Sequence, residues 1–206
     1  MGELLRRRAF MFAGESAHPD VIYQLPSATN TASYDTGVKL FDSGKSFTIL
    51  CEATLANRNW TGTQSVFGID TDWTFRLGRA SSGDNFVNGA FTQTGNLYTA
   101  IICNNTNSDT YTKKCCWLAG RMSNTSSKTE RFAVRYNHLL LKVEGFCNDG
   151  GVALFAPTQA WFTLNESIVS NSSLKLNLSS ANSTVNSLTI YNGLLSDGEI
   201  NSFLGA

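Results

Sequence analysis

The sequence predicts an all-β protein, a two-sheet antiparallel jelly-roll sandwich with a short C-terminal helix. Three observations lead to this fold class. Apolar and polar residues alternate with a period of two in several segments, turn-forming residues separate those segments, and helical periodicity is scarce. No strand–helix–strand rhythm is present, so a parallel α/β fold is excluded.

Residues 46–56 form the clearest predicted strand. From Phe47 to Leu55 every second residue is apolar, while Thr48, Glu52 and Thr54 occupy the other face. A half-buried antiparallel strand has this pattern, with Leu50 as an exception. The remaining predicted strands are Gly37–Phe41, Ser65–Ile69, Trp73–Leu77, Leu97–Cys103, Arg131–Tyr136, His138–Glu144, Val152–Phe155, Leu174–Leu178 and Ser187–Tyr191.

The C-terminal segment carries the one good helix signal. Ser196 and Glu199 have the Ser-x-x-Glu spacing of a capping box. Ile200 and Leu204 follow at helical spacing, and Gly205 suits a helix stop. The chain is therefore expected to end as a strand, a short loop and one or two helical turns.

The composition bounds the function classes. Lys and Arg total 16, as do Asp and Glu, so the formal net charge is zero and nucleic acid is not an expected partner. No apolar run approaches 18 residues, so no membrane span is expected. The five cysteines are odd in number and lack C-x-x-C spacing, which favours free thiols.

The first 20 residues are expected to form a separate basic arm or short helix, and residues 21–206 the sandwich. The apolar run after Arg8 is shorter than the core of a signal peptide. The run Arg6, Arg7, Arg8 is either a solvated basic end or an anchor to an acidic partner surface.

Three stretches resemble concanavalin A-like, laminin G-like jelly-roll domains of the lectin–glucanase kind. Leu188–Ile200 resembles the closing segment of that family, Lys45–Ala53 its early strand, and Arg131–Asn137 with Leu139–Glu144 its central hairpin. The resemblance covers roughly Tyr34 to the C-terminus. It implies two antiparallel sheets of six or seven strands each, one of them concave.

Two further segments resemble structural proteins of gut-bacterial phages and prophages: Leu4–Arg8 and Tyr34–Phe41. This resemblance implies a virion protein assembled in the host cytoplasm, with other virion proteins as partners and a tendency to form homo-oligomers.

The candidate carbohydrate-binding residues are aromatic and amide side chains in polar segments. Trp60 follows Asn59 in a polar segment, where a large exposed aromatic ring marks a contact surface. Asn85 lies in another turn-rich segment. Trp73 heads an alternating strand and suits either the core or a ligand surface. Sugars offer flat C–H faces to such rings and hydroxyls to the amides.

Asp70 and Asp72 are the candidate calcium ligands, because calcium takes carboxylate and carbonyl oxygens and some relatives in the resembled family hold it at a loop rim. The alternative is a pair of solvated, turn-capping aspartates. No other cofactor is expected.

Catalysis is not expected, because retaining glycoside hydrolysis needs two carboxyl groups about 5–5.5 Å apart. No two glutamates lie within five residues of each other in this chain.

The sequence thus favours a non-enzymatic virion structural or adhesion protein, a capsid- or tail-associated decoration or fibre component that binds host-surface carbohydrate. The alternative is a carbohydrate-binding module on a bacterial surface, and a glycoside hydrolase is third.

Overall fold

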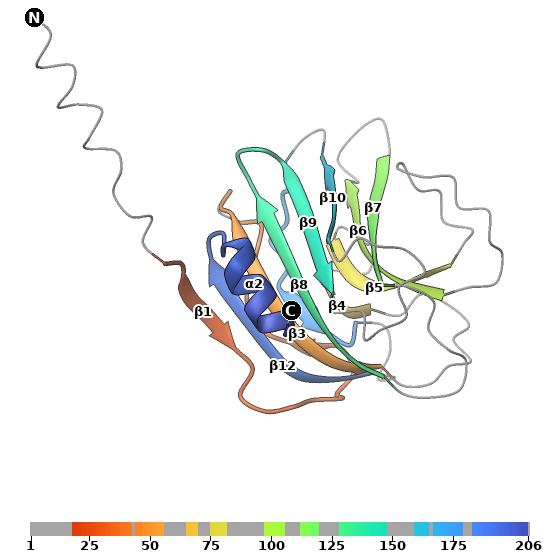
Figure 1. Ribbon diagram of the computed structural model, residues 1–206. Helices are drawn as coiled ribbons and strands as arrows, with labels where there is room; N and C mark the ends of the chain where they lie inside the picture. The colour runs from red at the N-terminus through yellow and green to blue at the C-terminus, as the bar shows by residue number, and fades with distance from the viewer. Residues whose placement is uncertain are drawn as a thin grey trace, which may run out of the picture.

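The structure is a computed structural model that describes residues 18–42, 44–55, 65–69, 75–81, 97–105, 112–119, 128–147, 159–164, 167–178 and 183–205. Within these ranges the chain forms two six-stranded antiparallel sheets and one C-terminal helix (Figure 1). The predicted all-β sandwich with a short terminal helix is therefore confirmed.

Sheet A holds the first and last strands of the chain side by side. Its order is β1 (Asp20–Gln24), β12 (Ser183–Asn192), β3 (Phe47–Leu55), β8 (Lys128–Asn137), β9 (Lys142–Cys147) and β10 (Gln159–Thr163). Asp20 pairs with Asn192, so β1 closes one edge against the strand that precedes the helix.

Sheet B packs behind it. Its order is β2 (Tyr34–Asp35), β11 (Leu174–Leu176), β4 (Ser65–Ile69), β5 (Phe75–Ser81), β6 (Leu97–Asn105) and β7 (Thr112–Ala119). The inward residues of its central strands are fully buried, among them Phe67, Phe75 and Leu174. The side chains between the two sheets thus form the core of the sandwich, as in other two-sheet sandwiches.

A cluster of aromatic rings joins the sheets. Phe47 and Tyr136 come from sheet A and Phe75 from sheet B. The ring of Phe41, from the loop after β2, lies 5.3 Å from Phe47, 5.5 Å from Phe75 and 5.3 Å from Tyr136, each in an edge-to-face arrangement. Such pairs add about 0.5–1.5 kcal/mol each beyond the area they bury.

Helix α2 (Asp197–Leu204) lies across the outer face of sheet A (Figure 1). Its N-terminus has the predicted capping box: the Ser196 hydroxyl accepts from the Glu199 N–H, and the Glu199 carboxylate accepts from the Ser196 N–H. Gly205 ends the helix with φ 79°, the left-handed conformation that glycine adopts without strain. Ile200 and Leu204 are buried against Leu50 and neighbouring residues of the sheet.

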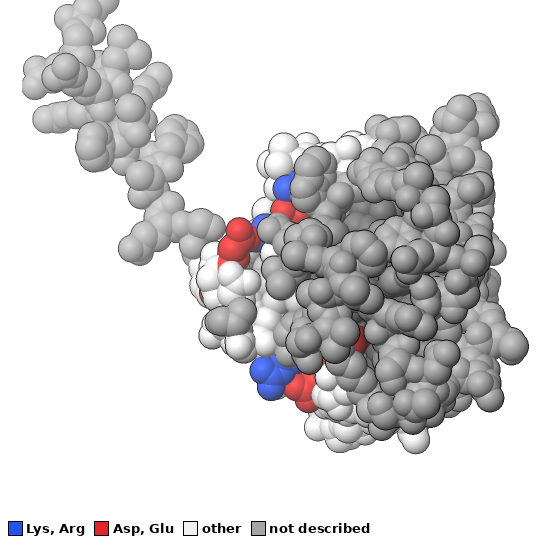
Figure 2. All heavy atoms as spheres, turned by 45° about the vertical axis from the view of Figure 1, so that its right-hand side comes forward, with Lys and Arg blue, Asp and Glu red and all other residues white. Residues whose placement is uncertain are grey.

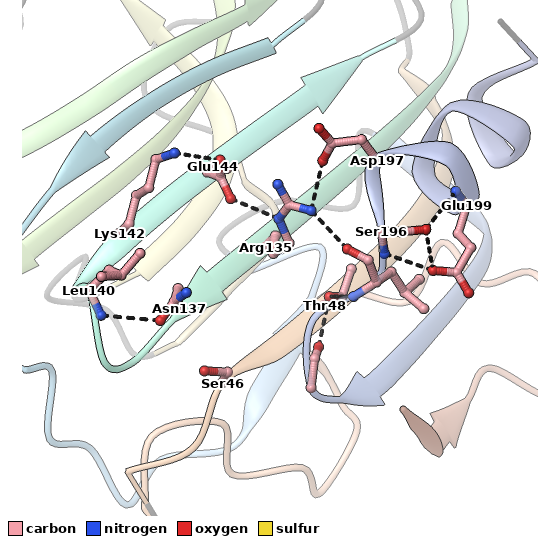
Figure 3. Close-up of polar contacts among 12 residues, drawn as sticks. Ser46, Thr48, Arg135, Asn137, Leu140, Lys142, Glu144, Ser196, Asp197 and Glu199 are labelled. Carbon is pink, nitrogen blue, oxygen red and sulfur yellow. Dashed lines mark hydrogen bonds and ion pairs between the residues drawn. The ribbon is translucent and has the colours of Figure 1, made fainter. Parts of the chain in front are cut away.

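A polar network fixes the helix to the sheet (Figure 3). The Arg135 guanidinium on β8 contacts Glu144 at 2.7 Å and Asp197 at 2.8 Å, and it donates to the Leu195 carbonyl. The Lys142 ammonium contacts the other Glu144 oxygen at 2.7 Å. Arg135 and Glu144 are only 13% and 8% exposed, so this is a largely desolvated ion pair.

The pKa of the Glu144 carboxyl reflects this setting. Burial raises it, but hydrogen bonds and charge from Arg135 and Lys142 outweigh burial and lower it below the ordinary value. Glu144 is therefore ionised in the folded protein at neutral pH.

Some predicted strands differ from those observed. The segment 37–41 is a loop, because the Asp35 carboxylate accepts from the Gly37 N–H and Gly37 takes φ 73°. Residues 138–141 form a turn in which Leu141 has φ 50°, so β9 begins only at Lys142. Strands β1, β2, β7 and β10 have no counterpart among the predicted strands, and the predicted strand Val152–Phe155 lies outside the described residues.

No helix in the described ranges is long and apolar enough to cross a membrane.

Replacing Arg135 by alanine should lower the free energy of unfolding by about 3 kcal/mol, because it leaves the Glu144 carboxylate buried without its main partner. Urea denaturation measures this. The matched control is Arg131→Ala, which breaks the more exposed pair with Glu52 and should cost about 1 kcal/mol or less. Equal losses in the two variants would contradict the assignment.

Stability should also depend on Glu144 in acid. The pKa of Glu144 in the folded state lies below its unfolded value of about 4.3. The contribution of Glu144 to the free energy of unfolding is therefore present above the unfolded pKa and is lost as pH falls through the folded pKa. Urea titrations between about pH 6 and pH 3 should show a smaller loss of unfolding free energy in Glu144→Gln than in the parent. Identical losses would show that Glu144 is not the group concerned.

Candidate functional site

All nine residues that the sequence predicts as site residues lie outside the described ranges. Asn59 and Trp60 fall in the connection from β3 to β4, Asp70, Asp72 and Trp73 in the connection from β4 to β5, Asn85 after β5, and Arg6, Arg7 and Arg8 before residue 18. Their roles stay predictions.

The described strand ends show where these connections attach. Ile69 pairs with Phe75 at one end of the β4–β5 pair, and Ser65 pairs with Gly78 toward the other. The connection that carries Asp70, Asp72 and Trp73 leaves from the first end. The connections that carry Asn59, Trp60 and Asn85 attach at the second end. The candidate metal ligands and most candidate sugar-binding residues therefore belong to connections at opposite ends of this strand pair.

Several titratable side chains on sheet A and α2 are already engaged in contacts. Glu52 contacts Arg131 at 2.8 Å, and Glu199 contacts His18 at 2.8 Å. The His138 Nδ1 lies 3.4 Å from the Tyr136 hydroxyl. Among the described residues, no group of three or more His, Cys, Asp or Glu side chains could hold a metal ion.

Charges of opposite sign lie side by side on the part of the surface visible in Figure 2, where the described Lys and Arg atoms adjoin Asp and Glu atoms. No extended surface of one sign is seen among the described residues in this view. A recognition site would therefore have to rest on a few placed charges rather than on a broad field.

Helix α2 covers the outer face of sheet A. The outer face of sheet B carries individual positive charges at outward strand positions. Leu174 and Leu176 are buried, so Lys175 between them occupies the outward position of β11. Phe75 and Leu77 are buried in the same way, which gives Arg76 the outward position of β5. Both strands present a single cation between two core residues.

The register brings these two positions into one row across the sheet. Lys175 pairs with Gly68 on β4, and Gly68 pairs with Arg76 on β5. Neighbouring strands are about 4.8 Å apart, so the two backbone positions are roughly 10 Å apart with a glycine between them. Gly68, which lies between the two cation positions in this row, is itself buried.

The same row begins with an acidic residue on the edge strand. Asp35 on β2 pairs with Lys175. A hydrogen bond from the Ser173 hydroxyl, the Gly37 N–H and the charge of Lys175 lower the pKa of the Asp35 carboxyl. The ionised Asp35 thus lies on the β2 side of Lys175, and Gly68 lies on the β4 side.

The adjacent rows on this face combine small and aromatic residues. One row runs Ser65, Gly78, Ala100, Trp117, and the next pairs Ala80 with Tyr98. Small residues beside aromatic ones are a common composition for a shallow site that accepts a flat ring.

Sequence reasoning missed Arg76 and Lys175 as site residues, although both stand in alternating segments. A lone cation between two apolar residues marks an outward position in any half-buried strand. Only the pairing of β11 with β4, whose residues are about 100 positions apart, shows that the two cations share a row.

No family model and no curated protein matches the chain. Solved structures do match. The carbohydrate-binding module CBM40 of the Ruminococcus gnavus IT-sialidase, bound to α2,6-sialyllactose, is similar with a TM-score of 0.59 and 14% identity, over 90% of this chain and 100% of that one. The same module bound to α2,3-sialyllactose gives a TM-score of 0.56 and 13% identity, over 91% and 100%.

The fold is the jelly-roll sandwich of these modules. At 13–14% identity the likeness shows the fold and nothing finer. The NanB sialidase of Streptococcus pneumoniae, as its K499G mutant, is also similar with a TM-score of 0.57 and 13% identity, but the chain spans only 28% of that protein. The likeness to CBM40 extends over 100% of that module. These similar structures are sialidases and their modules, so they lend no support to the expected virion context.

Proposed function

We propose that the protein is a non-catalytic carbohydrate-binding module whose ligand is an acidic, sialylated glycan bound on the outer face of sheet B. The observation that carries the proposal is the match to the complete CBM40 module, which was solved with sialyllactose bound. This is the second of the functions expected from the sequence, and it replaces the virion role as the preferred one.

The row Lys175–Gly68–Arg76 supports an acidic sugar in particular. A carboxylate bound across this row would meet a lysine position and an arginine position. Hydrogen bonds between charged groups contribute about 1.5–3 kcal/mol each, which suits a ligand that must be held on an open surface. Arginine adds a planar fork that matches a carboxylate.

The neighbouring rows support a ring-shaped ligand. Glycine or alanine stands at positions 78, 80 and 100 in these rows, and Tyr98 pairs with Ala80 and Trp117 with Ala100. An aromatic residue beside a shallow floor suits the apolar C–H face of a pyranose ring, while hydroxyls stay in contact with water.

We place the site of action of this module at the bacterial cell surface, where sialylated host glycans would meet it. The proposal requires no metal, and Asp70 and Asp72 keep only the optional calcium role predicted from the sequence.

The test is isothermal titration calorimetry of the full chain with α2,3- and α2,6-sialyllactose, compared with lactose. We expect the affinity for either sialyllactose to fall at least tenfold in Arg76→Gln and in Lys175→Gln, because each removes one charged partner of the carboxylate. The affinity for lactose should change less than twofold.

The matched control is Lys45→Gln, which removes an exposed lysine just before β3 in sheet A and should leave sialyllactose binding unchanged. Equal losses of sialyllactose affinity in Lys45→Gln and Lys175→Gln would show that the effect comes from net charge and not from the position of Lys175. Tight binding of sialyllactose by both Arg76→Gln and Lys175→Gln would show that the ligand does not sit on this row.

A further inference from the structure

A groove opens on the opposite side of the molecule, beside α2 on the outer face of sheet A. It has a volume of about 460 Å³, within the usual range of small-molecule pockets. Leu50 of β3 and Leu195 before the helix contribute buried apolar surface to it, and Tyr191 of β12 and Phe203 of α2 contribute aromatic surface.

The helix leaves this space open because its residues there are small. Gly198 and Ser202 are four positions apart, so they share one helix face, and both line the groove. A Cβ atom added at Gly198 would approach only the Ser196 hydroxyl, at 4.0 Å. The hollow is therefore built into the sequence of α2 and is not a packing fault of the core.

Polar groups at the rim are held in place. The His18 Nε2 lies 2.8 Å from the Glu199 Oε1, and the His18 ring meets the ring of Tyr191 edge-on. The Glu199 Oε2 accepts from the Ser196 N–H at 2.7 Å and from its hydroxyl at 2.6 Å (Figure 3). Since a carboxylate oxygen accepts two hydrogen bonds, Oε1 keeps capacity for a ligand hydroxyl.

From this arrangement we infer that the groove of α2 is a second binding site, for an uncharged sugar unit. The choice of a sugar rests on the proposed function, whereas the groove and its chemistry stand on their own. The rings of Tyr191 and Phe203 offer surface to the C–H face of the sugar, and Glu199, His18 and Ser202 offer partners to its hydroxyls.

Charge separates this ligand from the one on sheet B. Hydrogen bonds from Ser196 and the proximity of His18 hold the pKa of the Glu199 carboxyl below its ordinary value, so Glu199 places a carboxylate at this rim at neutral pH. An acidic sugar would be repelled here, while Lys175 and Arg76 attract it on the other face. The module would then hold an acidic sugar on one face and a neutral one on the other.

The test uses Gly198→Trp, which fills the groove, and Gly198→Ala, which leaves it open. Probes for the full chain are lactose, maltose and cellobiose as neutral sugars and the methyl glycoside of N-acetylneuraminic acid as the acidic one, followed by ligand-observed NMR and calorimetry. We expect Gly198→Trp to weaken binding of the preferred neutral sugar at least tenfold and Gly198→Ala less than twofold. Acidic-sugar binding should change less than twofold in both.

A second variant does not depend on filling the groove. Glu199→Gln keeps a capping-box residue but removes the charge, so α2 should form as before, as circular dichroism will show. Neutral-sugar affinity should fall at least threefold, because charge-assisted hydrogen bonds are about twice as strong as neutral ones.

The outcomes separate the two proposals. Equal effects of Gly198→Trp and Gly198→Ala, or no binding of any neutral sugar by a chain that binds the acidic one, would overturn the second site and leave the proposed function intact. Neutral-sugar binding that is lost in Gly198→Trp, in a chain that ignores the acidic sugar, would support the groove and overturn the proposed acidic ligand.

Discussion

Four aromatic rings pack between the two sheets. Because these rings point inward, they determine which residues of their strands point outward. Phe47 and Tyr136 point in from sheet A and Phe75 from sheet B, with Phe41 packed among them. Because side chains alternate along a strand, burying Phe75 commits Arg76 to the opposite face. A slip of one residue in register would bury the cation and expose the ring, so the core and the candidate site are specified together.

The same constraint gives the two outer faces different chemistry. On sheet A, Arg131 and Arg135 alternate with buried residues of β8, and both are engaged by carboxylates and by backbone carbonyls near α2. On sheet B the observed helix is absent, and the outward cations Arg76 and Lys175 flank a glycine position. Arg131 and Arg135 therefore fasten α2 to sheet A, whereas Arg76 and Lys175 hold outward strand positions on sheet B.

Much of the fold could be predicted from local patterns. The alternation in Phe47–Leu55 predicted β3, and Ser196 with Glu199 predicted the helix start, because strand faces and caps are determined by neighbours in the sequence. The segment 37–41 shows the limit: its apolar residues look like a strand, yet Leu40 and Phe41 reach the core from a loop that turns at Gly37.

The candidate site was harder to foresee for a physical reason. The sequence marks Arg76 and Lys175 only as outward residues, and the row they form depends on which strands are neighbours. That neighbour relation is set by packing over the whole sheet, which no local window contains. The groove beside α2 likewise needs Gly198, Tyr191 and His18 together, from three elements that only the folded chain assembles.

The position of β12 has a consequence for how the protein reaches this state. The last strand of the described chain does not lie at an edge but between β1 and β3; it pairs with β3 along most of its length and with β1 at Thr189–Asn192. During synthesis, the β3 edge that pairs with β12 therefore stays unpaired until β12 has left the ribosome. Folding should be slow and dominated by contacts between distant parts of the chain, and nascent chains that lack β12 should depend on chaperones to avoid pairing their open strand edges with each other.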